Sequence, residues 1–238
     1  MAILAEIIET LTSDAAVREL RAGPYWVAVW SRYCGLASTL ADPTRIDVEK
    51  LELASARSLA QMAVSPVWKE AGIGIAAINS LLEVDETRCR DLNARDLLME
   101  RGAGKRVALV GHFPFVPQLR DAVGELSVLE LQPRPGDLPA SEAPRVVPEA
   151  DVVAITGTAL VNGTMEDLLG YCRPQSLVVL LGPTVPLSPV LFDYGVDVIC
   201  GTRVIDPPAI LAQVEAGRSY REMTGVRMLA MQRDAQAG

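Results

Sequence analysis

Neutral polar side chains recur just after short apolar runs in the second half of the chain. The residues concerned are His112, Thr158, Asn162, Thr164, Thr184 and Thr202. Their hydroxyl, amide and imidazole groups donate and accept hydrogen bonds without a fixed charge. Such a set suits an anionic ligand or a metal-bound organic ligand better than a naked cation. We expect these side chains to line one pocket.

Glycines accompany these side chains at Gly111, Gly163, Gly182 and Gly201. Glycine permits sharp backbone turns and lets a ligand approach the main chain closely. We therefore include these four glycines among the candidate ligand-binding residues.

His112 is the only histidine in the chain and has two interpretations. It is a candidate general acid or base, or it is a packed residue that only satisfies hydrogen bonds. It cannot hold a metal ion alone, because zinc and similar ions need three or four ligands. No cluster of histidine and cysteine has ligand spacing, so the metal ligands are unknown. A metal would be held mainly by carboxylates such as Asp193, Asp197 or Asp206, or would arrive inside a larger ligand.

Residues 162–166, Asn-Gly-Thr-Met-Glu, also have two interpretations. Thr164 or Asn162 could cap a helix while an acidic side chain reaches back, as in a capping box. The same helix start could instead present free N–H groups to an anionic ligand. The two interpretations are compatible.

Nucleotide-binding motifs are mostly missing. Residues 111–116 do not form G-x-G-x-x-G, and Phe113 and Phe115 would block the approach of a pyrophosphate. Glu130, however, stands where a ribose-binding acid is expected. These observations argue against a dinucleotide and leave an adenosyl-type ligand open. The chain also has no G-x-x-x-x-G-K-[ST] and no G-x-S-x-G motif.

The second half alternates between buried strands and helices. Continuous apolar runs predict strands at 106–110, 126–131, 151–155, 177–181 and 196–199. Helices are expected at 116–123, 165–172 and 209–216. This alternation predicts a doubly wound parallel sheet, whose strands end at one edge, where ligands bind. Five prolines make 132–148 a long irregular link.

The first half has a different character. Its spacing predicts a helix over 3–11, a hairpin within 17–39, and helices over 51–64 and 67–83. Asn79 is the one amide in the apolar run 73–82, so it either supports a buried hydrogen-bond network or points into a ligand cleft. We include it among the ligand-binding candidates. A charged, glycine-containing segment then predicts two domains, 1–90 and 91–238.

Composition limits the partners and the location. A net charge of −8 argues against nucleic acid and anionic membranes. The four scattered cysteines are expected to be free thiols. The N-terminus lacks a basic signal-peptide region, and 177–192 is interrupted by prolines. We expect a soluble cytoplasmic protein.

Several of these segments resemble one family, named "putative heavy-metal chelation". They are 111–114 (GHFP), 150–164 (ADVVAITGTALVNGT), 182–186 (GPTVP), 23–29 (GPYWVAV) and 74–79 (GIAAIN). The resemblance implies an α/β protein in which a small α+β enolase N-terminal-like domain precedes a Rossmann-like domain. It also implies a cleft between the two domains and a homodimer.

Two hypotheses for the function follow. In the first, the protein binds or handles a metal, or a metal-organic complex, in the cleft between the domains. In the second, it is a Rossmann-type enzyme that acts on an anionic or adenosyl-containing small molecule, with His112 as general acid or base. The cofactor is unknown; a transition metal or a metal chelate is the candidate. Whether the chain is an enzyme is open at this stage.

Overall fold

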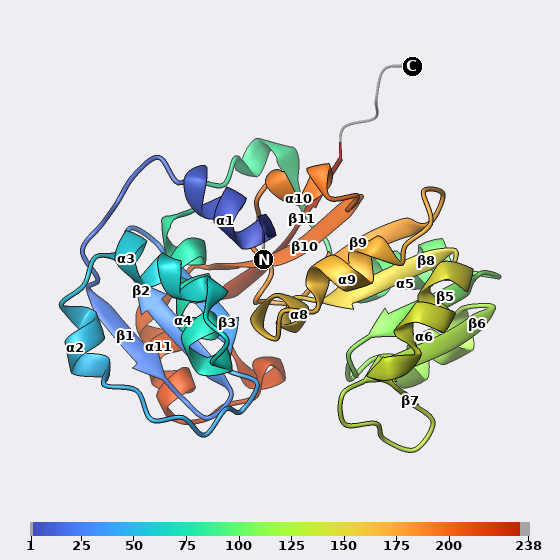
Figure 1. Ribbon diagram of the computed structural model, residues 1–238, viewed down its shortest axis with the longest axis horizontal. Helices are drawn as coiled ribbons and strands as arrows, with labels where there is room; N and C mark the ends of the chain where they lie inside the picture. The colour runs from blue at the N-terminus through green and yellow to red at the C-terminus, as the bar shows by residue number, and fades with distance from the viewer. Residues whose placement is uncertain (1, 234–238) are drawn as a thin grey trace.

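The computed structural model describes residues 2–233 and contains two β-sheets (Figure 1). The first unit comprises α1 (Ala2–Glu9), β1 (Glu19–Ala22), β2 (Trp26–Trp30), β3 (Cys34–Ser38), α2 (Val48–Glu52), α3 (Ala56–Ala60), the 3-10 helix η1 (Gln61–Val64) and α4 (Trp68–Leu81). Strands β1, β2 and β3 form an antiparallel sheet in that order. The expected hairpin is therefore present, and β3 extends it to three strands.

The helix expected over 51–64 is divided. Ser55 stands between α2 and α3, and its side chain accepts a hydrogen bond from the Ser58 amide. Serine at this position satisfies one of the free N–H groups at a helix start. A new helix therefore begins at Ala56, where the apolar spacing predicted continuous helix.

The second unit carries an eight-stranded sheet. Its strands are β4 (Cys89–Asp91), β5 (Arg106–Val110), β6 (Glu125–Glu130), β7 (Leu138–Pro139), β8 (Val152–Thr156), β9 (Leu177–Leu181), β10 (Val198–Val204) and β11 (Val226–Gln232). Their order is β4-β11-β10-β9-β8-β5-β6-β7. The pairs from β7 to β10 are parallel, whereas β11 and β4 add antiparallel strands at one edge. The predicted α/β class with a large parallel sheet is confirmed. The boundary expected at residue 90 falls inside β4 and stays a prediction.

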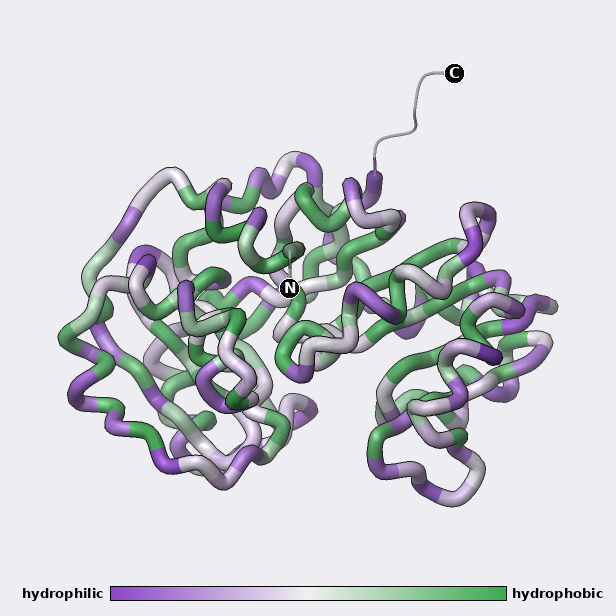
Figure 2. Tube along the Cα trace, viewed as in Figure 1, coloured by the Kyte–Doolittle hydropathy of each residue, from purple (hydrophilic) through white to green (hydrophobic). Residues whose placement is uncertain are grey.

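The helices of the second unit are η2 (Glu86–Arg88), α5 (Ala94–Gly102), α6 (Val116–Ala122), η3 (Ala140–Glu142), α7 (Ala143–Val146), η4 (Val147–Glu149), α8 (Thr158–Val161), α9 (Met165–Gly170), α10 (Val190–Asp193), α11 (Pro207–Glu215) and η5 (Tyr220–Glu222). Helix α11 packs on β1 and β2 of the small sheet, whereas other helices cover both faces of the large one. Apolar residues of α5 and α6 pack on one face of the sheet, and those of α7 to α10 pack on the other. Figure 2 shows hydrophobic stretches along the strands of the sheet. None of the helices within residues 2–233 is long and apolar enough to cross a membrane.

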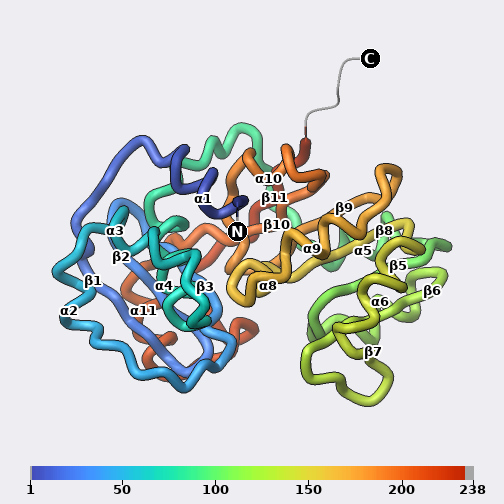
Figure 3. Tube along the Cα trace, viewed as in Figure 1, coloured from blue at the N-terminus to red at the C-terminus, as the bar shows by residue number. Residues whose placement is uncertain are grey.

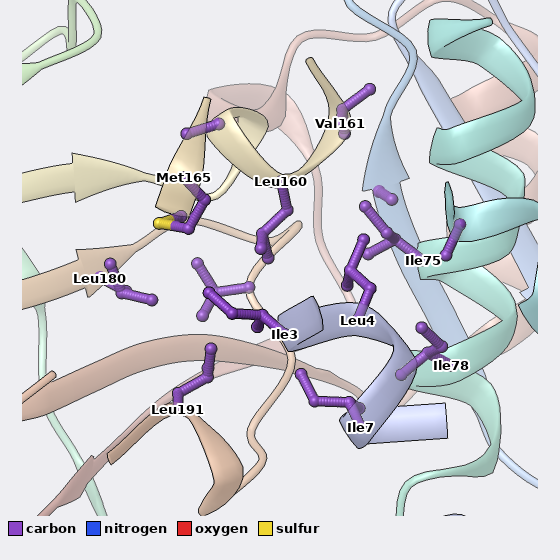
Figure 4. Close-up of a cluster of buried hydrophobic side chains, with 14 of the residues drawn as sticks. Ile3, Leu4, Ile7, Ile75, Ile78, Leu160, Val161, Met165, Leu180 and Leu191 are labelled. Carbon is purple, nitrogen blue, oxygen red and sulfur yellow. The ribbon is translucent and has the colours of Figure 1, made fainter. Parts of the chain in front are cut away.

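The two units share a core. Helix α1 lies between them: Ile3, Leu4 and Ile7 are fully buried (Figure 4). They pack in one cluster with Ile75 of α4 and Leu160 of α8. Figure 3 shows this blue N-terminal helix beside α10 from late in the chain. Burial of these large side chains, worth about 2 kcal/mol each, therefore stabilises the two units against each other.

Candidate ligand-binding pocket

A cavity of about 410 Å³ lies at the point where the connections of the large sheet diverge. The chain leaves β5 for α6 on one face and leaves β8 for α8 and α9 on the opposite face. Adjacent parallel strands whose connections diverge in this way leave a crevice beyond their carboxyl ends. The volume is within the usual range for small-molecule sites.

Apolar side chains form much of the cavity wall, among them Phe113, Leu129 and Leu168. Leu40 belongs to the first unit and contributes to the same wall. Its φ of 51° and that of Ala41, 55°, lie in the left-handed region, which is strained for residues with a Cβ. Such strain persists where the surrounding structure holds it, often beside binding sites.

His112 is held by two carboxylates. Its Nδ1 lies 2.8 Å from Oδ2 of Asp137, and its backbone amide donates to Oε2 of Glu130 at 2.8 Å. The His112 side chain is 18% exposed, whereas that of Asp137 is 2% exposed. The imidazole is thus fixed in orientation at the cavity, with the Asp137 carboxylate covered beside it.

The charge of Asp137 decides which ring nitrogen carries a proton. Burial raises the pKa of this carboxyl, but the hydrogen bonds from His112 and from the Arg134 amide outweigh it and lower the pKa below its ordinary value. Asp137 is therefore ionised at neutral pH and can only accept hydrogen bonds. Nδ1 of His112 must donate, which leaves Nε2 for a ligand or a proton.

Three of the predicted polar residues meet at the cavity after β8. Thr158, Asn162 and Thr164 line it together with Gly111 and His112. Oδ1 of Asn162 accepts from the amide of Thr164 at 3.1 Å and from its hydroxyl at 2.7 Å. The segment therefore forms a local turn before α9, whose N-cap residue Thr164 makes no side-chain capping bond, so the capping box considered above is absent. Glu166 does not reach back to the helix start; it accepts from the amide of Ile3 in α1.

Two predicted threonines have partners elsewhere. Oγ1 of Thr184 accepts from the amide of Ser38 at 3.0 Å, and Thr184 is 2% exposed. The hydroxyl of Thr202 lies 2.7 Å from that of Tyr220. Neither threonine lines the cavity. Thr184 instead joins the end of β3 to the loop after β9.

Asn79 also lies where the two units meet, outside the cavity lining. Its Nδ2 donates to the carbonyl of Leu36 at 3.2 Å and to that of Thr184 at 3.5 Å. Of the two alternatives drawn from the sequence, these contacts match the hydrogen-bond network.

The remaining predicted glycines do not line the cavity. Gly163 and Gly182 have φ values of 78° and 114°, so each allows a turn that other residues rarely adopt. Gly201 is close-packed, because a Cβ there would lie 2.8 Å from the Leu187 side chain. Gly111, which does line the cavity, has a φ of 99°.

Asp137 and Leu40 are site residues that the sequence analysis missed. Asp137 lies in the proline-rich link, which contains β7, η3, α7 and η4 rather than irregular chain alone. The Pro135-Gly136 pair just before Asp137 is a sequence signal for a turn that could present a side chain. In the structure Gly136 has a φ of 93°.

Two family models match this chain. A model of the DUF364 family, described as "Putative heavy-metal chelation", matches residues 93–232. A second model, DUF4213, has the same description and matches residues 4–82. This chain belongs to the DUF364 family.

Relatives of known structure share the whole fold. A DUF364 family protein of unknown function from Desulfitobacterium hafniense is 28% identical, with a TM-score of 0.89 over 98% of each chain. Another, from Pyrococcus horikoshii, is 23% identical, with a TM-score of 0.81 over 97% of this chain and 98% of the other, and supports the fold alone.

A sequence relative gives a further match. An uncharacterized protein of Methanocaldococcus jannaschii is 31% identical over 72% of this chain and 70% of its own length.

The family description prompts a test of whether the chain itself could hold a metal ion. Among residues 2–233, no group of three or more histidine, cysteine or acidic side chains could do so. Of the carboxylates considered above, Asp197 accepts from the Val178 amide and Asp206 caps α11. The described residues therefore do not fit a naked ion held by side chains alone.

The cysteines do not change this conclusion. All four are free thiols, as predicted, and Cys34 and Cys200 are buried. Burial raises the pKa of both thiols to about 12 and that of Cys172 to about 11. None of the four thiols belongs to a group of three or more side chains that could hold a metal ion among residues 2–233.

Proposed function

We propose that this DUF364 protein binds a metal ion as a complex with a small organic molecule, in the cavity at the cleft between the two units. The observation that carries the proposal is a cavity of about 410 Å³ whose surroundings lack a set of side-chain metal ligands within residues 2–233. If the protein handles a metal ion, as the description of its family states, most of the atoms that bind the metal must come from the organic molecule.

The cavity wall supports an organic ligand. Its apolar side chains would contact the carbon skeleton, and Thr158 and Asn162 would contact polar groups of the ligand. Nε2 of His112 could supply one nitrogen ligand to the cargo metal. Metal-binding histidines commonly donate their other N–H to a carboxylate, as Nδ1 of His112 does to Asp137.

Analysis of the untagged, natively purified protein tests the proposal. Mass spectrometry would measure metals in the intact protein and organic compounds released on denaturation. We expect a metal and an organic compound in equal, near-stoichiometric amounts, with both lost from Ser141→Trp, which fills the cavity from an exposed lining position. Tight binding of added Ni²⁺, Co²⁺ or Zn²⁺ without any organic compound would contradict it.

A second candidate function is acid–base catalysis on a small molecule, for instance an adenosyl compound, by His112. The His112–Asp137 hydrogen bond favours it, because a carboxylate that orients a histidine is a common catalytic arrangement. Incubation of the released compound with the protein in D₂O, followed by mass spectrometry, tests this function. Deuterium uptake or conversion should occur with the unmodified protein and be lost in His112→Gln; no change with the unmodified protein would contradict catalysis.

Homodimer formation, a cytoplasmic location and the absence of nucleic-acid and membrane partners stay predictions. Light scattering after gel filtration would test the first, with an expected mass of twice the chain's 25.5 kDa.

A further inference from the structure

From the charges around the cavity, we infer that it selects ligands that are neutral or positively charged and discriminates against phosphates and carboxylates. The inference rests on the proposed function, in that the cavity must bind a small molecule. It replaces the anionic ligand that neutral polar side chains alone suggested. For a metal-organic complex, it specifies a net charge of zero or above.

The fixed charges that line the cavity are acidic. Glu130 and Asp167 line it, and the Asp137 carboxyl lies directly behind His112, 2.8 Å from its Nδ1. No lysine or arginine is among its described lining residues. Arg134 interacts with Asp137, but its side chain is outside the lining. An anion entering the cavity would lose water without gaining a cationic partner, which is costly.

Glu130 lines the cavity, and the backbone holds its carboxylate in place. Its two oxygens accept from the amides of His112 and Leu131, at 2.8 and 2.7 Å. Carboxylate oxygens have about four lone-pair sites in total, so each can accept a further bond. Glu130 could therefore accept a hydrogen bond from a hydroxyl or an amine of the ligand.

The loop after β5 offers no phosphate cradle to offset these acids. After Gly111 the loop continues as His112-Phe113-Pro114. Phe113 occupies the cavity wall and stacks on Phe115, with ring centres 5.2 Å apart. Proline lacks an N–H, and the aromatic ring stands where glycine-rich loops admit a phosphate. An aromatic wall beside acidic groups suits a flat ligand that carries an amine or another positive charge.

Affinity-selection mass spectrometry with matched compounds would test the inference. The probes are benzylamine, benzyl alcohol, benzoate and benzyl phosphate, together with larger two-ring analogues of each. A probe is counted as bound in the cavity when its mass-spectrometric signal with the unmodified protein is lost with the Ser141→Trp variant. We expect the amines and alcohols to be retained at least tenfold more than the carboxylates and phosphates.

Charge variants test the cause. Asp167→Asn removes an acidic lining group from an exposed position and should weaken amine binding by about fivefold. Asp121→Asn removes the same charge from the exposed end of α6, outside the lining, and should leave binding unchanged.

The outcomes separate this inference from the proposed function. If carboxylates or phosphates bind at the Ser141→Trp-sensitive site as well as the amines do, the charge selection is wrong and small-molecule binding stands. If Asp121→Asn weakens amine binding as much as Asp167→Asn, selection by the lining charge is also wrong. If no probe binds at that site, both the charge selection and the proposed small-molecule site fail.

Discussion

Nδ1 of His112 and Oδ2 of Asp137 lie 2.8 Å apart although the residues are 25 positions apart in the chain. One follows β5 and the other precedes β7, so the contact crosses over the end of β6. It fixes the imidazole of the only histidine at the edge of the cavity.

Asp137→Asn should lower the free energy of unfolding at neutral pH by about 1–2 kcal/mol, because it removes a buried charge-assisted hydrogen bond. The pKa of Asp137 in the folded protein lies below its ordinary value of 3.8. The stability from its ionised form is therefore present above that value and is lost as pH falls through the lower, folded-state pKa.

Urea unfolding of both proteins between pH 2 and 7 measures this effect. The difference in stability should shrink as pH falls below 4, where the Asp137 carboxylate gains a proton. A difference that stays the same down to pH 2 would contradict the assigned ionisation of Asp137.

Asn162→Ala should retain the fold and lose the co-purifying compound. The loss of its bonds to Thr164 removes a local turn contact worth about 1 kcal/mol, which thermal denaturation can measure. Asn162→Asp is the matched control, because it keeps the acceptor oxygen and should keep that stability. Normal retention of the compound in Asn162→Ala and His112→Ala would show that neither residue contributes to the site.

Thr184→Val should destabilise the protein by about 1–3 kcal/mol, because the buried amide of Ser38 loses its acceptor while the side-chain shape is kept. Thr184→Ser keeps the hydroxyl, so its free energy of unfolding should fall much less. Urea midpoints of the three proteins provide the measurement. Equal stability of the valine and serine variants would show that the Thr184 hydroxyl does not help to join the two units.

Ala41→Gly should stabilise the protein by about 0.5–1 kcal/mol, since Ala41 is exposed and has a φ of 55°. The same substitution at Ala212, an exposed position within α11, should instead cost about 1 kcal/mol. Thermal and urea unfolding compare the two variants. A loss in Ala41→Gly as large as in Ala212→Gly would contradict the left-handed conformation at residue 41.

Several elements could be predicted because their signals are local. Continuous apolar runs indicated β5, β8 and β9, with ends at or within one residue of those observed. Strand β3 was missed: its sequence, Cys-Gly-Leu-Ala-Ser, has no alternation, because all five of its residues are buried. The short β7 lay in a segment whose prolines argued only against helix.

The sequence by itself determined the alternation of strands and helices, and with it the edge of the sheet where polar loops gather. Local spacing is enough for this, because burial on both faces of a strand needs an unbroken apolar run. Tertiary structure alone decided which loops share the cavity. Strand order places the ends of β5 and β8 side by side where their connections diverge to opposite faces. The threonines after β9 and in β10 lie farther along the sheet. There the hydroxyl of Thr184 is hydrogen-bonded to the Ser38 amide, and that of Thr202 to the Tyr220 hydroxyl. Contacts between residues distant in the chain, such as that of Asp137 with His112, leave no periodic pattern, because they depend on how complete elements pack.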